Sequence, residues 1–196
     1  MWNSEQIRLR EQLVVVDDFD WTLEGDHQVR LIGGVDISFV NDVNSHEACA
    51  SLIVLNYPEL EVVYQDFERV TLTLPYIPGF LAFREAKFLV DRIEHLKSTK
   101  PDLLPQVIFV DGNGILHSRG FGLASHLGVL VDIPTIGIGK TFFAVDGLTE
   151  HWTKGQNNQF LHQKGDFYNL QGRSQKIWGA VIFFFFFFLL KNEFHF

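Results

Sequence analysis

The sequence predicts an α/β protein built on a mixed β-sheet that is flanked by helices. Three strand-like apolar segments, 29–40, 48–55 and 60–66, follow one another with short turns, as in an antiparallel meander. Between residues 79 and 139, helical and strand-like segments alternate, which is typical of parallel strands joined by helices. The chain has 196 residues, 46% of them hydrophobic, which is enough for one domain with a sizeable core.

The first half is expected to begin with a helix and to continue into the meander. Residues 3–15 carry apolar side chains at helical spacing, and Ser4 can cap this helix. The first strand is followed by a polar turn at 41–46, and residues 68–74 extend the sheet beyond the third strand. The apolar positions of the helix are Ile7, Leu9 and Leu13.

The second half alternates helices with buried strands. Residues 79–97 repeat apolar side chains at helical spacing, and Lys100-Pro101-Asp102 ends that helix. Two apolar segments, 106–111 and 133–139, are expected as buried strands, with a short helix rich in small residues at 119–130 between them. Residues 149–176 are polar and weakly patterned. The apolar positions of the long helix are Phe80, Phe83, Phe88, Leu89, Ile93 and Leu96.

Net charge and cysteine content narrow the functional classes. The formal net charge of −8 argues against a protein that holds nucleic acid through bulk positive charge. It is compatible with an enzyme whose metal ion supplies positive charge locally. The single cysteine, Cys49, excludes an intramolecular disulfide and indicates a reducing compartment. The first ten residues contain no apolar stretch of the kind found in secretory signals.

Three carboxylates lie where a metal-dependent nuclease needs them. Asp36 interrupts an apolar strand, Asp111 ends another, and Glu85 lies in the predicted helix after Pro78. A carboxylate buried on an apolar strand costs several kcal/mol unless a cation or hydrogen bonds compensate for it. Hard oxygen ligands favour Mg²⁺ or Mn²⁺. Taken alone, Glu85 is an ordinary solvated helix residue, and only its association with Asp36 and Asp111 suggests a function.

Five further residues each have a functional and a structural interpretation. Lys140 follows a buried strand and can reach a phosphate, although a solvated lysine fits the local sequence nearly as well. His117 and Arg119 lie beside a glycine-rich turn and can contact a phosphate backbone or simply face solvent. His126 fits a core histidine. Tyr76, which lies between prolines, suits a wedge inserted into a base stack, or an aromatic packed under a loop.

Several long segments, in order along the chain, resemble the motifs of endonuclease V, and most closely those of vertebrate members. The resemblance extends from about residue 5 to about residue 180. Five segments carry it, at residues 33–38, 75–85, 110–117, 119–128 and 137–140. The first three of these read Gly-Gly-Val-Asp-Ile-Ser, Pro-Tyr-Ile-Pro-Gly-Phe-Leu-Ala-Phe-Arg-Glu and Val-Asp-Gly-Asn-Gly-Ile-Leu-His.

This resemblance implies a ribonuclease H-like fold and an endonuclease that requires Mg²⁺ or Mn²⁺. Such enzymes recognise inosine in RNA or deoxyinosine in DNA and cleave the second phosphodiester bond on the 3′ side. Vertebrate members favour single-stranded RNA. By this resemblance Asp36, Glu85 and Asp111 are catalytic metal ligands and Lys140 is an active-site lysine. The implied nucleic-acid contacts are the wedge residues Pro75, Tyr76, Ile77 and Pro78, and Gly112, Asn113, His117 and Gly122 near the base pocket and its phosphates.

The resemblance stops near Ala180. We therefore expect an endonuclease V-like domain at 1–180 that lacks the family's later elements, followed by a divergent phenylalanine-rich tail at 181–196. One alternative is an impaired isoform that binds RNA or a partner without cleavage. Another is a membrane-tethered form, but the 14-residue apolar segment 177–190 is shorter than the ~20 residues needed to span a bilayer. We expect a monomer in the cytoplasm and nucleus, the nucleolus included, without stable membrane association.

Overall fold

The computed structural model describes residues 2–16, 19–23, 25, 27–39, 46–140 and 142–183. The chain forms two compact units, Met1–Thr141 and Phe142–Phe196. Most of the predicted phenylalanine-rich tail and the predicted turn at 41–45 lie outside the described residues. The division of the chain at residues 180 and 181 therefore stays a prediction.

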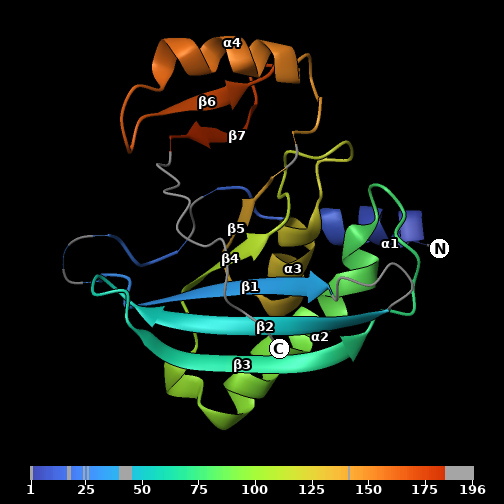
Figure 1. Cartoon of the computed structure of the whole chain (residues 1–196), viewed down its shortest axis with the longest axis vertical. Helices are drawn as coiled ribbons and strands as arrows, with labels where there is room; N and C mark the ends of the chain where they lie inside the picture. The colour runs from blue at the N-terminus through green and yellow to red at the C-terminus, as the bar shows by residue number, and fades with distance from the viewer. Residues whose placement is uncertain are drawn as a thin grey trace. The chain divides into compact units, whose positions relative to one another are not determined.

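The first unit contains the predicted antiparallel meander (Figure 1). Strand β1 (Leu31–Phe39) pairs with β2 (Glu47–Asn56), and β2 pairs with β3 (Val62–Thr71). Buried and less buried residues alternate along β2, as expected of a strand with one face on the core. The sequence divided the third strand at residue 67, whereas the structure has a single strand because β2 pairs continuously from Glu47 to Val54.

Two parallel strands complete the sheet. Strand β4 (Val107–Asp111) pairs with β1, and β5 (Thr135–Ile138) pairs with β4, so that the order is β3-β2-β1-β4-β5. Short helix α3 (Leu123–Val131) connects β4 to β5 and begins later than predicted. Its start is displaced because residues 117–122 form a turn, in which the His117 ring accepts a hydrogen bond from the Arg119 amide at 3.2 Å. The prediction of a mixed sheet with flanking helices is confirmed.

One hydrophobic core joins the sheet to its two main helices. Helix α2 (Leu81–Thr99) buries Leu89, Ile93 and Leu96, which recur at helical spacing and pack against the inward-facing residues of β1 and β2. Helix α3 adds Leu127 and Val131 to the same cluster. A short 3-10 turn (Pro101–Leu103) follows α2, as Lys100-Pro101 predicts. The core therefore fixes α2, and with it Glu85, against the strands that carry Asp36 and Asp111.

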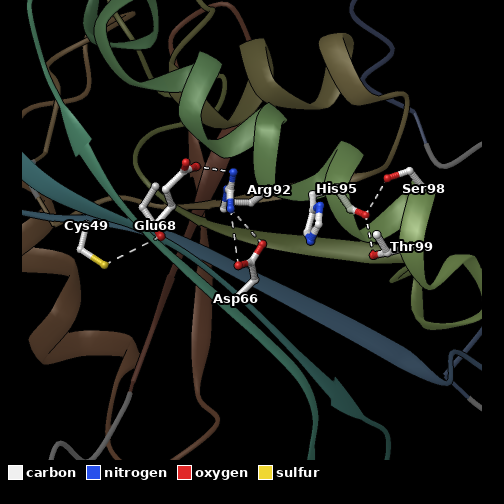
Figure 2. Close-up of polar contacts among 8 residues, drawn as sticks. Cys49, Asp66, Glu68, Arg92, His95, Ser98 and Thr99 are labelled. Carbon is white, nitrogen blue, oxygen red and sulfur yellow. Dashed lines mark hydrogen bonds and ion pairs between the residues drawn. The ribbon is translucent and has the colours of Figure 1, made fainter.

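An ion-pair cluster attaches α2 to the outer strand of the sheet (Figure 2). The Arg92 guanidinium pairs with the Asp66 carboxylate at 3.2 Å and also with the Glu68 carboxylate, both of which lie on β3. The side chains of Arg92 and Asp66 are only 15% and 17% exposed, so that solvent screens this pair poorly. The contact supplements apolar packing in holding the helix on the sheet.

The N-terminal helix is shorter than predicted. Helix α1 spans Trp2–Arg10, and the chain turns immediately after it, with the Gln12 and Leu13 amides bonding to carbonyls three residues back. Ser4 lies inside the helix and does not cap it. The helix does not continue through residues 14–16 as predicted, where three β-branched valines are poor helix formers and are exposed. Its buried residues are Gln6 and Leu9.

The second unit holds a helix and a hairpin that the sequence did not predict. Helix α4 (Glu150–Phe160) is capped by the Thr149 hydroxyl, and strands β6 (Phe167–Gln171) and β7 (Ile177–Ile182) pair antiparallel. Tyr168 donates a hydrogen bond to the Asn157 side chain at 2.7 Å and so ties the hairpin to the helix. Among the described residues, no helix has the length and apolar character needed to span a membrane.

Candidate active site

Two predicted carboxylates lie on neighbouring parallel strands, Asp36 within β1 and Asp111 at the end of β4. The register of β1 and β4 places Val35 opposite Val110, so Asp36 and Asp111 are the next residues of the two strands. Ligands bind preferentially at the carboxyl ends of strands in α/β sheets. Burial, and then the nearby Asp111 carboxyl, raise the pKa of Asp36 above its ordinary value. The two acids therefore share one site.

The Asp36 carboxylate also has a polar partner on its own strand. The Ser38 hydroxyl donates a hydrogen bond to Asp36 Oδ2 at 3.1 Å, and the Ser51 hydroxyl on β2 donates to the Asp36 backbone carbonyl at 3.2 Å. These contacts fix the Asp36 backbone and one carboxylate oxygen of the half-buried side chain. Ser38 is a site residue that sequence reasoning did not single out, although the i, i+2 spacing on a strand places both side chains on one face.

Glu85 is buried, in contrast to the solvated helix residue that its local sequence suggests. Its exposure is 6%, because α2 packs this side against the sheet. Burial raises the pKa of Glu85 to about 7, and the negative charges of Asp36 and Asp111 act in the same direction. The neighbouring Arg84 guanidinium opposes them. The structure therefore brings the three predicted carboxylates into one electrostatic environment.

Lys140 supplies the positive charge of this site. Its Nζ lies 2.5 Å from Asp111 Oδ2, and its side chain is 77% exposed. The hydrogen bond and charge of Asp111 raise the pKa of Lys140, so the ammonium form is favoured. Lys140 reaches Asp111 because β5, which ends two residues earlier, lies beside β4 in the sheet. Lys140 is solvated, as the structural interpretation of the sequence expects, and it is also paired with Asp111, so its functional role stays a prediction.

The donor chemistry of the site suits a hard divalent cation. Carboxylate oxygens from Asp36, Glu85 and Asp111 are the ligand type of Mg²⁺ and Mn²⁺. Burial raises the pKa of Glu85 and of Asp36, and the neighbouring carboxylates add to the shift, so a cation at this site would stabilise the ionised forms. Within the part of the chain that the structure describes, no three acidic, histidine or cysteine side chains are yet gathered closely enough to enclose a metal ion. The metal ligands therefore stay a prediction.

The glycine-rich loop that follows β4, at residues 112–114, packs against α3 and β5. The Gly112 amide bonds to the Ile138 carbonyl at 3.0 Å, and the Asn113 carbonyl accepts the Ala124 amide at 3.1 Å. A side chain at Gly137 would meet the Gly114 nitrogen and the Gly112 oxygen at 2.5 and 2.6 Å, and one at Gly122 would collide with Asn113. The backbones of this loop, of β5 at Gly137 and of the start of α3 at Gly122 therefore approach so closely that both positions require glycine.

The predicted nucleic-acid contacts divide into an exposed segment and a buried one. Residues Pro75–Pro78 are exposed, with Tyr76 at 57%, which agrees with a wedge better than with an aromatic packed under a loop. His117 is buried at 5%, and burial lowers its pKa. The Arg119 guanidinium lies 4.2 Å from the centre of the Phe80 ring and donates to the Gly79 carbonyl at 3.4 Å. The two segments therefore adjoin through Arg119.

His126 is a core residue, as one interpretation of the sequence suggests. It is 5% exposed and contacts the rings of Phe83 and Phe121 at 5.1 and 5.5 Å between centroids. Burial lowers the pKa of His126 to about 4, so the ring is neutral. Its Nδ1 atom is buried without a hydrogen-bond partner in the described structure. His126 therefore contributes packing rather than charge.

Comparison with known proteins agrees with this geometry. The sequence profile of endonuclease V matches residues 8–184. The chain belongs to the endonuclease V family. It is 45% identical to human Endonuclease V and 46% identical to the mouse protein, over 183 residues and 93% of this chain in both cases. Those 183 residues cover 64% of the human protein and 54% of the mouse protein, so the chain spans less than two thirds of these endonuclease V relatives.

Solved endonuclease V structures share the fold. The catalytic domain of human Endonuclease V is 46% identical, with a TM-score of 0.86 over 92% of this chain and 74% of that chain. Endonuclease V from Ciona intestinalis, in complex with a DNA containing an inosine followed by a ribo-adenosine, is 33% identical. Its TM-score is 0.82 over 93% of this chain and 75% of that chain. These likenesses confirm the predicted ribonuclease H-like architecture.

Proposed function

We propose that this endonuclease V family member is a metal-dependent endonuclease that cleaves nucleic acid containing inosine or deoxyinosine. Within this proposal, the bond cut is the second phosphodiester bond on the 3′ side, and single-stranded RNA is the first substrate to test. The observation that carries the proposal is the convergence of Asp36, Glu85, Asp111 and Lys140 at one edge of the sheet. The inosine-containing DNA in the structure of the Ciona relative supports this substrate class.

The three carboxylates would hold Mg²⁺, with Mn²⁺ as a substitute. A bound divalent ion would supply Lewis acidity and neutralise charge on the phosphate. Glu85 is the member whose protonation the site controls most strongly, because burial raises its pKa to about 7. In the absence of a cation, a proton on Glu85 takes over part of the charge compensation. Binding of the cation would release that proton.

Lys140 would stabilise negative charge that develops on the reacting phosphate. Its ammonium is held by Asp111 but remains exposed, so it can reach a phosphate oxygen while staying at the site. A protein with a net charge of −8 needs such local cations to accept a phosphate backbone. Arg119, beside the wedge segment, is a second local cation.

Recognition would require the base to leave its stack. Pro75, Tyr76, Ile77 and Pro78 form the exposed segment that can enter a strand of stacked bases, because their prolines limit backbone freedom. Beside that segment, the loop containing Gly112, Asn113, His117 and Gly122 would border the extruded base, which in this proposal is a purine that lacks a 2-amino group.

Cleavage of an end-labelled single-stranded RNA with one inosine tests the proposal. With Mg²⁺, we expect one product that ends at the second bond 3′ to inosine, with a 3′-hydroxyl on that fragment and a 5′-phosphate on the other. Asp36→Ala should abolish cutting, whereas Asp102→Ala, a matched change at an exposed aspartate, should leave it intact. Binding of this RNA by folded protein without any cutting would instead support an impaired, RNA-binding family member.

A further inference from the structure

Gln6 is a buried polar residue on a helix that is otherwise mostly exposed. Its exposure is 3%, although α1 is predominantly polar. The side-chain nitrogen Nε2 donates to the Gly79 carbonyl at 3.0 Å and to the Phe121 carbonyl at 3.1 Å. One amide group therefore joins three segments of the chain, because its two acceptors lie 73 and 115 residues away in sequence.

The chemistry of this contact requires an amide donor. Both partners are carbonyl oxygens, so only the NH₂ end of the amide can face them, and the reverse orientation would set oxygen against oxygen. A carboxylate at position 6 would repel both carbonyls. Gln6 Oε1 is buried without a hydrogen-bond partner among the described residues, so the position is maintained by the two donated bonds.

Other contacts of α1 reinforce the same junction. The Trp2 ring stacks on Phe83, with 5.4 Å between centroids and 7° between planes. Arg10 Nη1 donates to the Arg119 carbonyl at 3.0 Å, and Arg119 in turn donates to the Gly79 carbonyl. Helix α1 is thus bonded to both loops that Gln6 joins, and the loops are bonded to each other.

The two acceptors of Gln6 border the two predicted nucleic-acid-binding segments. Gly79 directly follows the wedge residues Pro75–Pro78, and Phe121 directly precedes Gly122 at the start of α3. Gly79 has a φ of 83°, and Gly120, just before Phe121, has a φ of 64°, so both borders are sharp turns. Each turn needs an external contact to fix its direction relative to the other.

We propose that Gln6 is a positioning residue. It holds the wedge segment, Pro75–Pro78, in register with the loop at 112–122 that would border the extruded base. This inference rests on the proposed function for its kinetic consequence. Because Gln6 touches neither the carboxylates nor Lys140 through any hydrogen bond described here, its loss should affect substrate fit rather than the chemical step. Glu85 stays in place through the apolar packing of α2.

Gln6→Met tests this inference, because methionine keeps the length and volume of glutamine and removes both donated bonds. We expect KM for an inosine-containing RNA to rise about fivefold with kcat nearly unchanged, because the two hydrogen bonds position protein segments that would contact the substrate equally in the ground state and the transition state. Gln12→Met is the matched control, because Gln12 is exposed and its side chain donates to the Arg8 carbonyl within its own segment. It should behave as wild type.

A purely structural role would give a different pattern. Loss of folded protein lowers kcat in proportion and leaves KM unchanged, so a fall in kcat alone would overturn the proposal. Thermal unfolding of each variant measures the folded fraction at the assay temperature. An unchanged KM in fully folded Gln6→Met protein would overturn it as well.

Amide hydrogen exchange separates this inference from the proposed activity. In Gln6→Met, peptides covering 75–80 and 117–122 should both exchange faster than in wild type, while peptides of β2 should not change. If wild-type protein cuts no inosine-containing substrate, the proposed activity fails, and the exchange experiment still decides the role of Gln6. Unchanged exchange in both peptides would overturn the positioning role.

Discussion

Replacing Glu85 with glutamine should make the protein more stable while removing its activity. An acid whose pKa is raised on folding binds more protons in the folded state than in the unfolded state. Stability then falls as pH rises through the window between the two pKa values. For Glu85 that window runs from the ordinary value of 4.5 to about 7. The ionised carboxylate therefore destabilises the fold above neutral pH, and a neutral amide of the same shape does not.

The size of this effect follows from the width of the window. A pKa difference between 4.5 and about 7 corresponds to roughly 3 kcal/mol at about pH 7.5. The opposing charge of Arg84 is already contained in this pKa, so we expect Glu85→Gln to gain roughly 3 kcal/mol. For a chain of this size, that gain should raise the unfolding midpoint by roughly 6 to 12 °C.

The assay is thermal unfolding of wild type and Glu85→Gln in EDTA, at a series of pH values from about 4.5 to about 8. EDTA removes divalent cations, whose binding to the carboxylates would mask the effect. The stabilisation should be near zero at the acid end, where Glu85 is protonated, and should grow with pH. Cleavage of inosine-containing RNA in Mg²⁺ should be lost in the same variant.

Two results would refute this reasoning. A variant that is no more stable than wild type at about pH 7.5 would show that Glu85 carries no unfavourable charge. A stabilisation of equal size at all pH values would show that the gain comes from packing. Glu94→Gln, a matched change on the exposed side of α2, should shift the midpoint little at any pH.

Three further predictions concern other parts of the first unit. Lowering the pH from 6.5 to about 4 should destabilise wild type relative to His126→Gln, by about 2 kcal/mol near pH 5. The reason is that the unfolded chain binds a proton on His126 in this range, whereas the buried ring does not. Denaturant unfolding at several pH values measures the difference. Arg92→Met should lower the free energy of unfolding by about 2 kcal/mol, because it leaves the mostly buried Asp66 carboxylate without its ion pair. Lys87→Met is the control, because it breaks an exposed ion pair, and it should cost under about 0.5 kcal/mol. Lys140→Met should lower kcat about a hundredfold with little change in unfolding midpoint, since its side chain is 77% exposed.

The strands and the carboxylate pair could be predicted from the sequence because their signals are local. An aspartate within an apolar strand, such as Asp36, and one at a strand end, such as Asp111, are visible in a few neighbouring residues. The parallel register that brings them together follows from the helix–strand alternation. The pairing of Lys140 with Asp111 was not predicted and is shown by the structure.

What the sequence missed depends on contacts between distant segments. Glu85 is buried by the sheet rather than by its helical neighbours, and Gln6 is buried by loops 73 and 115 residues away. The end of α1 at Arg10 reflects where packing stops, although apolar residues continue beyond it. Among the described residues, strands β6 and β7 form a sheet of their own, and a short two-stranded hairpin leaves a weak pattern in a polar segment.

Gly122 and Gly137, which pack closely against the loop after β4, affect how a match to the glycine motifs should be interpreted. Gly122 and Gly137 are required by backbones that approach too closely for any side chain, whether or not the protein cuts nucleic acid. A relative that has lost its carboxylates would still need both glycines to fold. Sequence searches that rely on the glycine motifs therefore detect shared architecture, and under the proposed function it is the acidic positions and Lys140 that would distinguish a nuclease from an inactive relative.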